Sequence, residues 1–323
     1  MFKPSRKVLA IAMLVAGSAA FAQSFPNRPV RIITPYSTGI APDITARIVA
    51  EKLARQWNQA VSVEPRPGAN GMIAINAGRK SPADGHEILV LGNAHLTVNP
   101  VLFKDWTVDA LAEFTPVNLV YRAGYIIAVG TNAPYKSIKE MIDAAKVGVD
   151  KVSYSSAYVG SPQHFGGAQL GSMVGAQMLA VHFKETGQMM AAVANGDTNF
   201  VIATLGSTGA LVKAGKMRIL ATISPKRLST HPDVPTVGES GGPANFHVDT
   251  WMSLVVPKAT PAAIVSQLGA DIGKVLADPE VVSKFRTFGV EPETASPARI
   301  AEMTRTELKQ NAELVQRIGI KAE

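Results

Sequence analysis

Short apolar runs alternate with helical patterns along most of the 323-residue chain, and this alternation limits the fold more than any other feature. Each run suits one buried strand, and most neighbouring runs are separated by a segment with apolar residues at helical spacing. The pattern predicts an α/β fold with largely parallel sheets. The candidate strands are 30–34, 61–64, 87–91, 117–120, 126–129, 152–154, 178–181, 200–203, 218–222 and 250–256.

Several helix starts can be read directly from the sequence. Ser137 followed by Glu140 forms a capping box, which predicts a helix after it. Thr260-Pro261, Asp278-Pro279 and Ser296-Pro297 each place an N-cap residue before a proline at the first helical position. We therefore expect helices to begin at all four places.

The chain is long enough for two domains, yet it contains no composition shift that would mark a flexible linker. The domains should then be joined by short crossing segments, which we place at 121–125 and 223–226 because each contains Gly or Pro beside an apolar strand. This assigns 124–223 to an inserted domain and 23–123 with 224–323 to the other. Two α/β domains joined in this way enclose a cleft that opens and closes about a hinge.

The first 22 residues have the pattern of a cleavable secretory leader. Lys3, Arg6 and Lys7 precede an apolar stretch at 8–21, and Ala20-Phe21-Ala22 is a small-x-small cleavage site. The stretch is short for a membrane-spanning helix, and no other run reaches roughly 18 residues. We expect 1–22 to be removed and the mature protein to be exported to the periplasm. A retained membrane anchor is the alternative.

Charge, cysteine content and the absence of nucleotide motifs exclude several classes of function. Loss of the leader's three cations lowers the formal net charge from +7 to +4, and no dense Lys/Arg run suggests a nucleic-acid partner. The chain has no cysteine, which excludes disulfides, thiol catalysis and Cys-based metal sites. No glycine pattern for a nucleotide or dinucleotide stands where a strand–turn–helix needs it, so no cofactor is expected.

Four loops that follow candidate strands carry hydroxyl, amide and imidazole groups. In open α/β sheets, ligands sit beyond the carboxyl ends of strands, and the following helix start presents N–H groups that suit a carboxylate. Asp43 is expected to be the N-cap of a helix at 44–56. Each loop read alone is also consistent with a plain helix cap. The candidate ligand-binding residues are Tyr36, Ser37, Thr38, Gly39 and Asp43; Asn93 and His95; Ser155, Ser156, Tyr158, Gly160, Ser161 and His164; and Thr204 and Ser207.

Catalytic motifs give little support for an enzyme. Gly238-Glu239-Ser240-Gly241-Gly242 matches the Gly-x-Ser-x-Gly pattern, but a nucleophile elbow needs a strand before the serine and a helix after it. Here prolines bound the segment, which predicts a loop. The six histidines show no metal-ligand spacing, so no metal is expected. A periplasmic serine hydrolase is kept as the alternative function.

Motifs spread over nearly the whole mature chain carry a family resemblance. The chain resembles the Bug-type extracytoplasmic solute-binding proteins, the receptor components of tripartite tricarboxylate transporters. The matching segments are 25–31, Glu64-Pro65-Arg66-Pro67-Gly68-Ala69-Asn70-Gly71, Ala83-Asp84-Gly85-His86, Asn99-Pro100, Phe114-Thr115-Pro116-Val117, Lys213-Ala214-Gly215-Lys216, 232–237 and Ala277-Asp278-Pro279-Glu280.

The resemblance implies a two-domain periplasmic-binding-protein ("Venus flytrap") fold and a function without chemistry on the ligand. It implies small organic mono- or dicarboxylate ligands, held largely by backbone N–H groups, hydroxyls and ordered water. Carried over, the first binding loop is 36–43 and the carboxylate clamp of the second domain is 155–164. The implied partner is a membrane transporter, or a membrane sensor component, and we expect a monomer.

Some positions depart from the family pattern. Ile40 and Ala41 stand where glycines are common, Pro42 replaces a common Thr and lacks an N–H, and Pro162 and Gln163 replace small hydroxyl residues. Glu185 also stands where the family usually has glycine. These changes point to a different ligand, such as a bulkier or aromatic acid, to weaker binding or to no binding.

Tyrosines in opposite domains raise the question of an aromatic ligand. Tyr36 and Tyr158 lie in loops expected to face the cleft, where two rings would sandwich a flat aromatic carboxylate. The rival interpretation packs each ring against its own domain and leaves an aliphatic dicarboxylate as the ligand.

Overall fold

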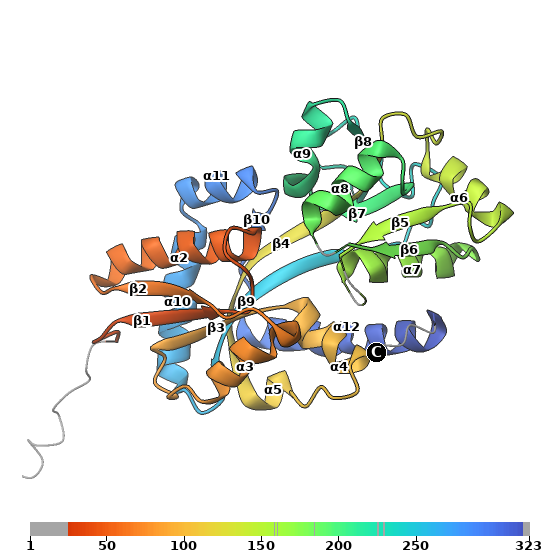
Figure 1. The fold of residues 1–323 in the computed structure, drawn as a ribbon. Helices are drawn as coiled ribbons and strands as arrows, with labels where there is room; N and C mark the ends of the chain where they lie inside the picture. The colour runs from red at the N-terminus through yellow and green to blue at the C-terminus, as the bar shows by residue number, and fades with distance from the viewer. Residues whose placement is uncertain are drawn as a thin grey trace, which may run out of the picture.

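The computed structural model describes residues 25–318 except 158, 160, 184, 225 and 229, so the predicted leader at 1–22 lies outside the described residues. The chain forms two lobes joined by the long strand β4 and by the segment that leads into β9 (Figure 1). We call residues 25–124 with 249–318 the first lobe and residues 125–248 the second lobe. Within the described ranges, no helix has the length and apolar character needed to cross a membrane.

The first lobe contains the N-terminal and C-terminal elements. They are β1 (Val30–Thr34), α2 (Ala41–Trp57), β2 (Val61–Pro65), η2 (Ala69–Gly71), α3 (Met72–Arg79), β3 (Glu87–Gly92), η3 (Ala94–Val98), α4 (Asn99–Leu102), α5 (Ala110–Glu113), most of β4 (Phe114–Gly130), β9 (Asp249–Pro257), α10 (Ala262–Leu276), α11 (Pro279–Thr287), β10 (Glu291–Pro292) and α12 (Pro297–Ile318).

The second lobe is built from the middle of the chain and the end of β4. Its elements are α6 (Ile138–Val147), β5 (Ser153–Ser156), α7 (Pro162–Val174), β6 (Leu179–His182), α8 (Thr186–Asn195), β7 (Phe200–Ala203), α9 (Leu205–Lys213) and β8 (Met217–Ile223).

One strand passes between the lobes and changes partners on the way. The strand order is β2-β1-β3-β9-β4-β7-β5-β6, with β8 and β10 also paired to β4. Along β4, residues 114–124 pair with β9, and residues 125–130 pair with β7 and β8. Because the partners change between Gly124 and Tyr125, we propose the first crossing there, inside the segment 121–125 predicted from the sequence.

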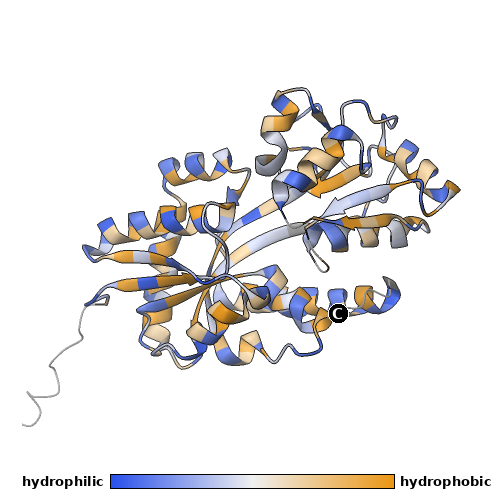
Figure 2. Cartoon of the chain, in the orientation of Figure 1, coloured by the Kyte–Doolittle hydropathy of each residue, from blue (hydrophilic) through white to orange (hydrophobic). Residues whose placement is uncertain are grey.

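Each lobe has apolar clusters on both faces of its sheet. In the first lobe, Val49 and Leu53 of α2 pack with one cluster, and Trp251 with Ile300 and Met303 of α12 belongs to the other. In the second lobe, α6 and α7 cover one face and α8 and α9 the other. Figure 2 shows the corresponding pattern, with apolar strands inside and helices that carry both polar and apolar residues.

Most predicted elements are present, with a few differences. β1 and β7 have the predicted bounds, and Ser137 and Asp278 cap α6 and α11 through their side chains. The two strands predicted at 117–120 and 126–129 are one continuous strand, because Gly124 continues the extended backbone without a turn. The sheets are mixed rather than largely parallel, since β4 pairs antiparallel with β7, β8, β9 and β10.

The return crossing lies later in the chain than the sequence indicates. Val237 and Phe246 belong to a core cluster of the second lobe, and Thr222 accepts a backbone hydrogen bond from Val237 at 3.0 Å. The chain re-enters the first lobe's sheet only at Asp249, where β9 begins. We therefore propose the second domain boundary at 248–249 in place of 223–224.

Candidate functional site

The candidate site is the gap between the lobes, where strand ends and helix starts of both lobes face one another. β1 and β3 end at this gap in the first lobe, and α7 and α9 begin at it in the second. The first N–H groups of a helix have no acceptor within the helix and carry a partial positive charge. Such helix starts suit an anionic ligand.

Asp43 holds the loop between β1 and α2 in shape. Its Oδ2 accepts from the Gly39 N–H at 3.0 Å, and Arg47 binds both carboxylate oxygens at 3.0 and 2.9 Å. The Asp43 side chain is buried. The expectation that Asp43 is the N-cap was wrong, because α2 begins at Ala41 with Ile40 as N-cap and Asp43 lies within the first turn.

The same loop presents its outer residues to solvent. Ser37, Thr38, Gly39 and Ile40 are exposed, and the Ile40 side chain stands beside the start of α2. Ala41 and Asp43 contribute first-turn N–H groups, whereas Pro42 contributes none. The departures from the family pattern therefore lie at the helix start itself.

Tyr36 and His95 are packed into the first lobe. The two rings meet edge to face with centroids 5.3 Å apart. His95 is buried and its Nδ1 accepts from the Gly92 N–H at 3.4 Å. Burial lowers the pKa of His95 to about 4, outweighing the Gly92 hydrogen bond, so the imidazole is neutral at neutral pH. A Cβ at Gly71 would lie 2.4 Å from the His95 ring, so only glycine fits there.

Three predicted serines in the second lobe make internal hydrogen bonds. Ser155 Oγ lies 2.6 Å from Thr198 Oγ1, Ser156 Oγ lies 2.5 Å from His182 Nδ1, and Ser161 Oγ accepts from the His164 N–H at 3.2 Å. All three serines are fully buried. In this arrangement the start of α7 presents its backbone N–H groups to a ligand, and these hydroxyls are not available. Tyr158 and Gly160 lie outside the described residues.

Two histidines, His164 and His182, pack against each other beside Ser156. The His164 and His182 rings are 5.0 Å apart and nearly perpendicular. Burial, and then the neighbouring His182, lowers the pKa of His164 to about 4, and burial also lowers the pKa of His182. Both rings are therefore neutral at neutral pH.

Thr204 and Ser207 form the start of α9. Thr204 Oγ1 accepts from the Ser207 N–H at 3.4 Å, and Ser207 Oγ donates to the Thr204 carbonyl at 2.9 Å. Ser207 is exposed to solvent. Thr204 is the N-cap of α9, as the alternative interpretation of this loop as a plain helix cap expects.

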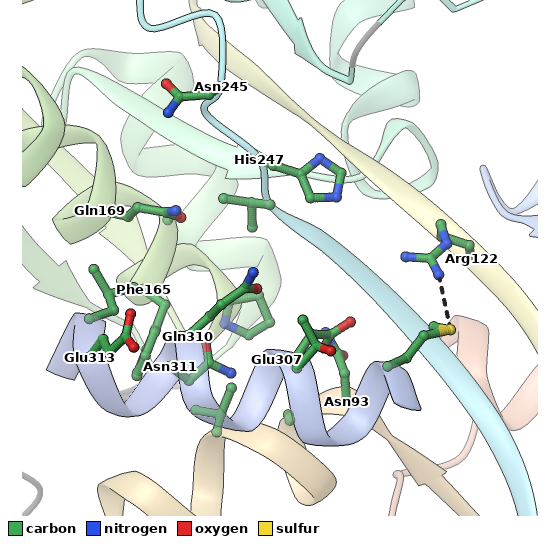
Figure 3. Close-up of a pocket in the computed structure, with 18 of the residues that line it drawn as sticks. Asn93, Arg122, Phe165, Gln169, Asn245, His247, Glu307, Gln310, Asn311 and Glu313 are labelled. Carbon is green, nitrogen blue, oxygen red and sulfur yellow. Dashed lines mark hydrogen bonds between the residues drawn. The ribbon is translucent and has the colours of Figure 1, made fainter. Parts of the chain in front are cut away.

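A cavity of about 540 Å³ lies in the gap, between α7, α12 and the two crossing strands (Figure 3). Of the predicted residues that the structure describes, only Asn93 lines it, and Pro162 at the start of α7 faces it from the second lobe. Two of the four predicted loops thus border one cavity. The wall residues that sequence reasoning missed include Arg122, His247, Gln310 and Asn311.

Helix α12 forms the outer wall of this cavity. Glu307 accepts from the Trp251 Nε1–H at 2.7 Å, and Asn311 Nδ2 donates to Thr97 at 3.1 and 3.2 Å, which fixes the helix to the first lobe. Near its end, Leu314 packs with Phe165 of α7 and Leu102 of α4. The only sequence signal for α12 was its Ser296-Pro297 start, which says nothing about the second lobe.

A family comparison agrees with this geometry. A family model described as "Tripartite tricarboxylate transporter family receptor" matches residues 45–320. The chain belongs to this receptor family. The resemblance read from the sequence is thereby confirmed.

Relatives of this tricarboxylate transporter receptor cover almost its whole length. A UPF0065 protein of Bordetella bronchiseptica is 31% identical over 319 residues, covering 98% of this chain and 94% of the relative. Protein BugT of Bordetella pertussis is 28% identical over 317 residues, covering 97% of each.

Solved structures share the receptor's fold. Rpa4515 of R. palustris with adipate superposes with a TM-score of 0.82 at 26% identity, over 93% of this chain and all of that one. Periplasmic binding protein BugD superposes with a TM-score of 0.77 at 28% identity and the same coverage. The predicted periplasmic-binding-protein fold is confirmed.

Ser240 stabilises the start of α6. Its Oγ accepts from the Ile138 N–H at 2.9 Å and its carbonyl accepts from the Lys139 N–H at 2.9 Å, so it holds the start of α6. In the part of the chain that the structure describes, no strand leads into Ser240 and no helix follows it, as the nucleophile elbow would need. Within the described residues, no group of three or more His, Asp or Glu side chains is arranged to hold a metal.

Proposed function

We propose that this receptor captures an aliphatic dicarboxylate between its lobes and delivers it, unchanged, to a membrane transporter. The observation that carries the proposal is that α2 of the first lobe and α7 of the second each begin at the end that faces the other lobe (Figure 1). Two anion-accepting ends on opposite lobes suit a ligand with a carboxylate at each end. The family assignment and the relative solved with adipate support the same ligand class.

The residue types in the four loops favour recognition by backbone groups. Segments 36–43, 92–95, 155–164 and 204–208 contain neither Lys nor Arg. A carboxylate bound here would therefore be held by N–H groups, the exposed hydroxyls of Ser37, Thr38 and Ser207, and water. A ligand that contacts both lobes favours the closed arrangement by its greater affinity for it.

An aromatic ligand is less well supported. The Tyr36 ring packs with the first-lobe core and against His95 instead of standing free in the gap. This contact favours the interpretation in which Tyr36 stabilises its own lobe.

The proposal includes the setting in which the receptor works. We propose that residues 1–22 direct export to the periplasm and are removed, and that the mature receptor acts as a monomer. The mild positive charge of the mature chain would favour small anions.

Thermal unfolding of the mature protein tests the ligand class. Adipate and succinate are compared with hexanoate, which matches the length of adipate but has one carboxylate, and with benzoate. At one hundred times Kd a ligand adds about 2.7 kcal/mol, which corresponds to a rise in Tm of about 5 °C. We expect the dicarboxylates to raise Tm most. A larger rise with benzoate, or none with any acid at millimolar concentration, would contradict the proposal.

A further inference from the structure

The backbones of the two lobes touch at a pair of glycines. A Cβ placed on Gly206, at the start of α9, would lie 2.2 Å from the Phe288 carbonyl oxygen and 2.7 Å from its carbon. A Cβ on Gly289 would lie 2.5 Å from the Gly206 nitrogen. Cβ atoms in proteins essentially never come within 3.0 Å of such atoms. The contact is possible only because neither residue has a side chain.

Each side of this contact is fixed to a different lobe. α9 packs into the second-lobe core through Leu205, Leu211 and Val212. Phe288 and Gly289 end α11 through hydrogen bonds to the Phe285 and Arg286 carbonyls at 2.9 and 3.0 Å, and the chain then enters β10, which pairs with β4. In Figure 1, α9 and α11 lie on the same side of the crossing strand β4. The glycine pair is therefore a point at which the two lobes meet.

We propose that the Gly206–Gly289 contact is the stop that defines the closed state of the receptor, and that Gly206 is a positioning residue for ligand capture. This rests on the proposed function. Movement about β4 and β9 lets the lobes approach until these backbones touch. A methyl group at Gly206 would meet backbone atoms rather than a flexible side chain, so it would hold the lobes apart. A ligand that needs both lobes then binds to a smaller closed population.

Helix α9 supplies a matched control for the test. Gly209 lies one turn after Gly206 on the same exposed helix, and a Cβ there would meet nothing within 4 Å. Gly206→Ala and Gly209→Ala therefore add the same methyl group to the same helix, Gly206 in its first turn and Gly209 in its interior. Only the first introduces a clash between the lobes.

The experiment measures adipate affinity by calorimetry and the interlobe distance by fluorescence energy transfer. Because the chain has no cysteine, dyes can be attached at Glu51→Cys in α2 and Lys146→Cys in α6, both exposed. We expect Gly206→Ala to weaken adipate binding about tenfold and to give lower transfer efficiency at saturating adipate. Gly209→Ala should match the wild type, and neither variant should have a lower Tm without ligand.

Equal affinity and equal energy transfer in the two variants would overturn the proposal. So would a ligand-free Gly206→Ala protein with a Tm below that of the wild type, because a contact made only on closure does not stabilise the open protein. If the wild type binds no dicarboxylate, the proposed function fails. The energy-transfer comparison without ligand still tests the contact, since the minor closed population of the ligand-free protein should be smaller in Gly206→Ala than in Gly209→Ala.

Discussion

The Tyr36 ring meets the His95 imidazole edge to face, with centroids 5.3 Å apart and ring planes at 84°. This contact ties the loop after β1 to the loop after β3. Gly92 allows it, since a Cβ at that position would lie 2.3 Å from the Tyr36 hydroxyl oxygen. This contact therefore holds two loops of the first lobe together at the gap. His95 is buried, so it stabilises these loops and does not contact the ligand.

His95→Gln should reduce the loss of stability in mild acid. The folded protein keeps the His95 pKa near 4, whereas the unfolded chain has the ordinary value of 6.5. Between these values only the unfolded chain takes up the proton, so stability falls as the pH falls from 6.5 towards 4 and is unaffected by this group above 6.5. His95 should then contribute a loss of about 2 kcal/mol between pH 7.5 and 5.

Urea unfolding at the two pH values measures this effect. The loss of unfolding free energy should be smaller in His95→Gln than in the wild type. His231→Gln, in the loop after β8, serves as the control. Equal pH dependence in the wild type and His95→Gln would show that His95 does not remain neutral in the folded protein.

Pro42→Ala should tighten binding of adipate if the start of α2 binds a carboxylate. The change adds one N–H in the first turn of α2, and a hydrogen bond to a charged group contributes about 1 kcal/mol or more, or roughly fivefold in Kd. Pro279→Ala is the control, because it makes the same change at the start of α11, outside the four predicted loops. Calorimetry compares the two, and an unchanged Kd in Pro42→Ala would place the carboxylate elsewhere.

Ser161→Ala should lower stability by about 1 kcal/mol, because its hydroxyl caps α7. The buried position of this side chain argues against a direct hydrogen bond from its hydroxyl to a ligand. Ser207→Ala, which removes an exposed hydroxyl at the start of α9, should change stability by less. Chemical unfolding measures both. A stable Ser161→Ala protein with much weaker adipate binding would instead assign this hydroxyl to the ligand.

Ser240→Ala should lower stability by about 1–2 kcal/mol and leave adipate affinity unchanged. The substitution removes the acceptor for the Ile138 N–H at the start of α6, and Ile138 is fully buried. Unfolding and calorimetry provide the two readouts. An esterase activity of the wild type that disappears in Ser240→Ala would revive the hydrolase alternative.

Local chemistry explains why so many elements could be predicted. β1 and β7 have the predicted bounds because a short buried strand is set by its own apolar run. Ser137 and Asp278 act as caps because a cap needs only residues within one turn. Asp43 was misplaced for a related reason: Pro42 suits the first turn of a helix, and the helix therefore begins before the aspartate.

The sequence by itself determined the alternating strands and helices, the family resemblance and the four loops at strand ends, since these depend on neighbours in the chain. Only the tertiary structure decided which groups meet across the gap. Asn93 and Pro162 border one cavity, α12 closes its side, and Gly206 meets Gly289. These partners are separated by tens of residues in the chain, and they come together because β4 crosses from one lobe to the other and the chain returns just before β9. No local pattern records such a contact, because it depends on how two separately packed cores are oriented about shared strands.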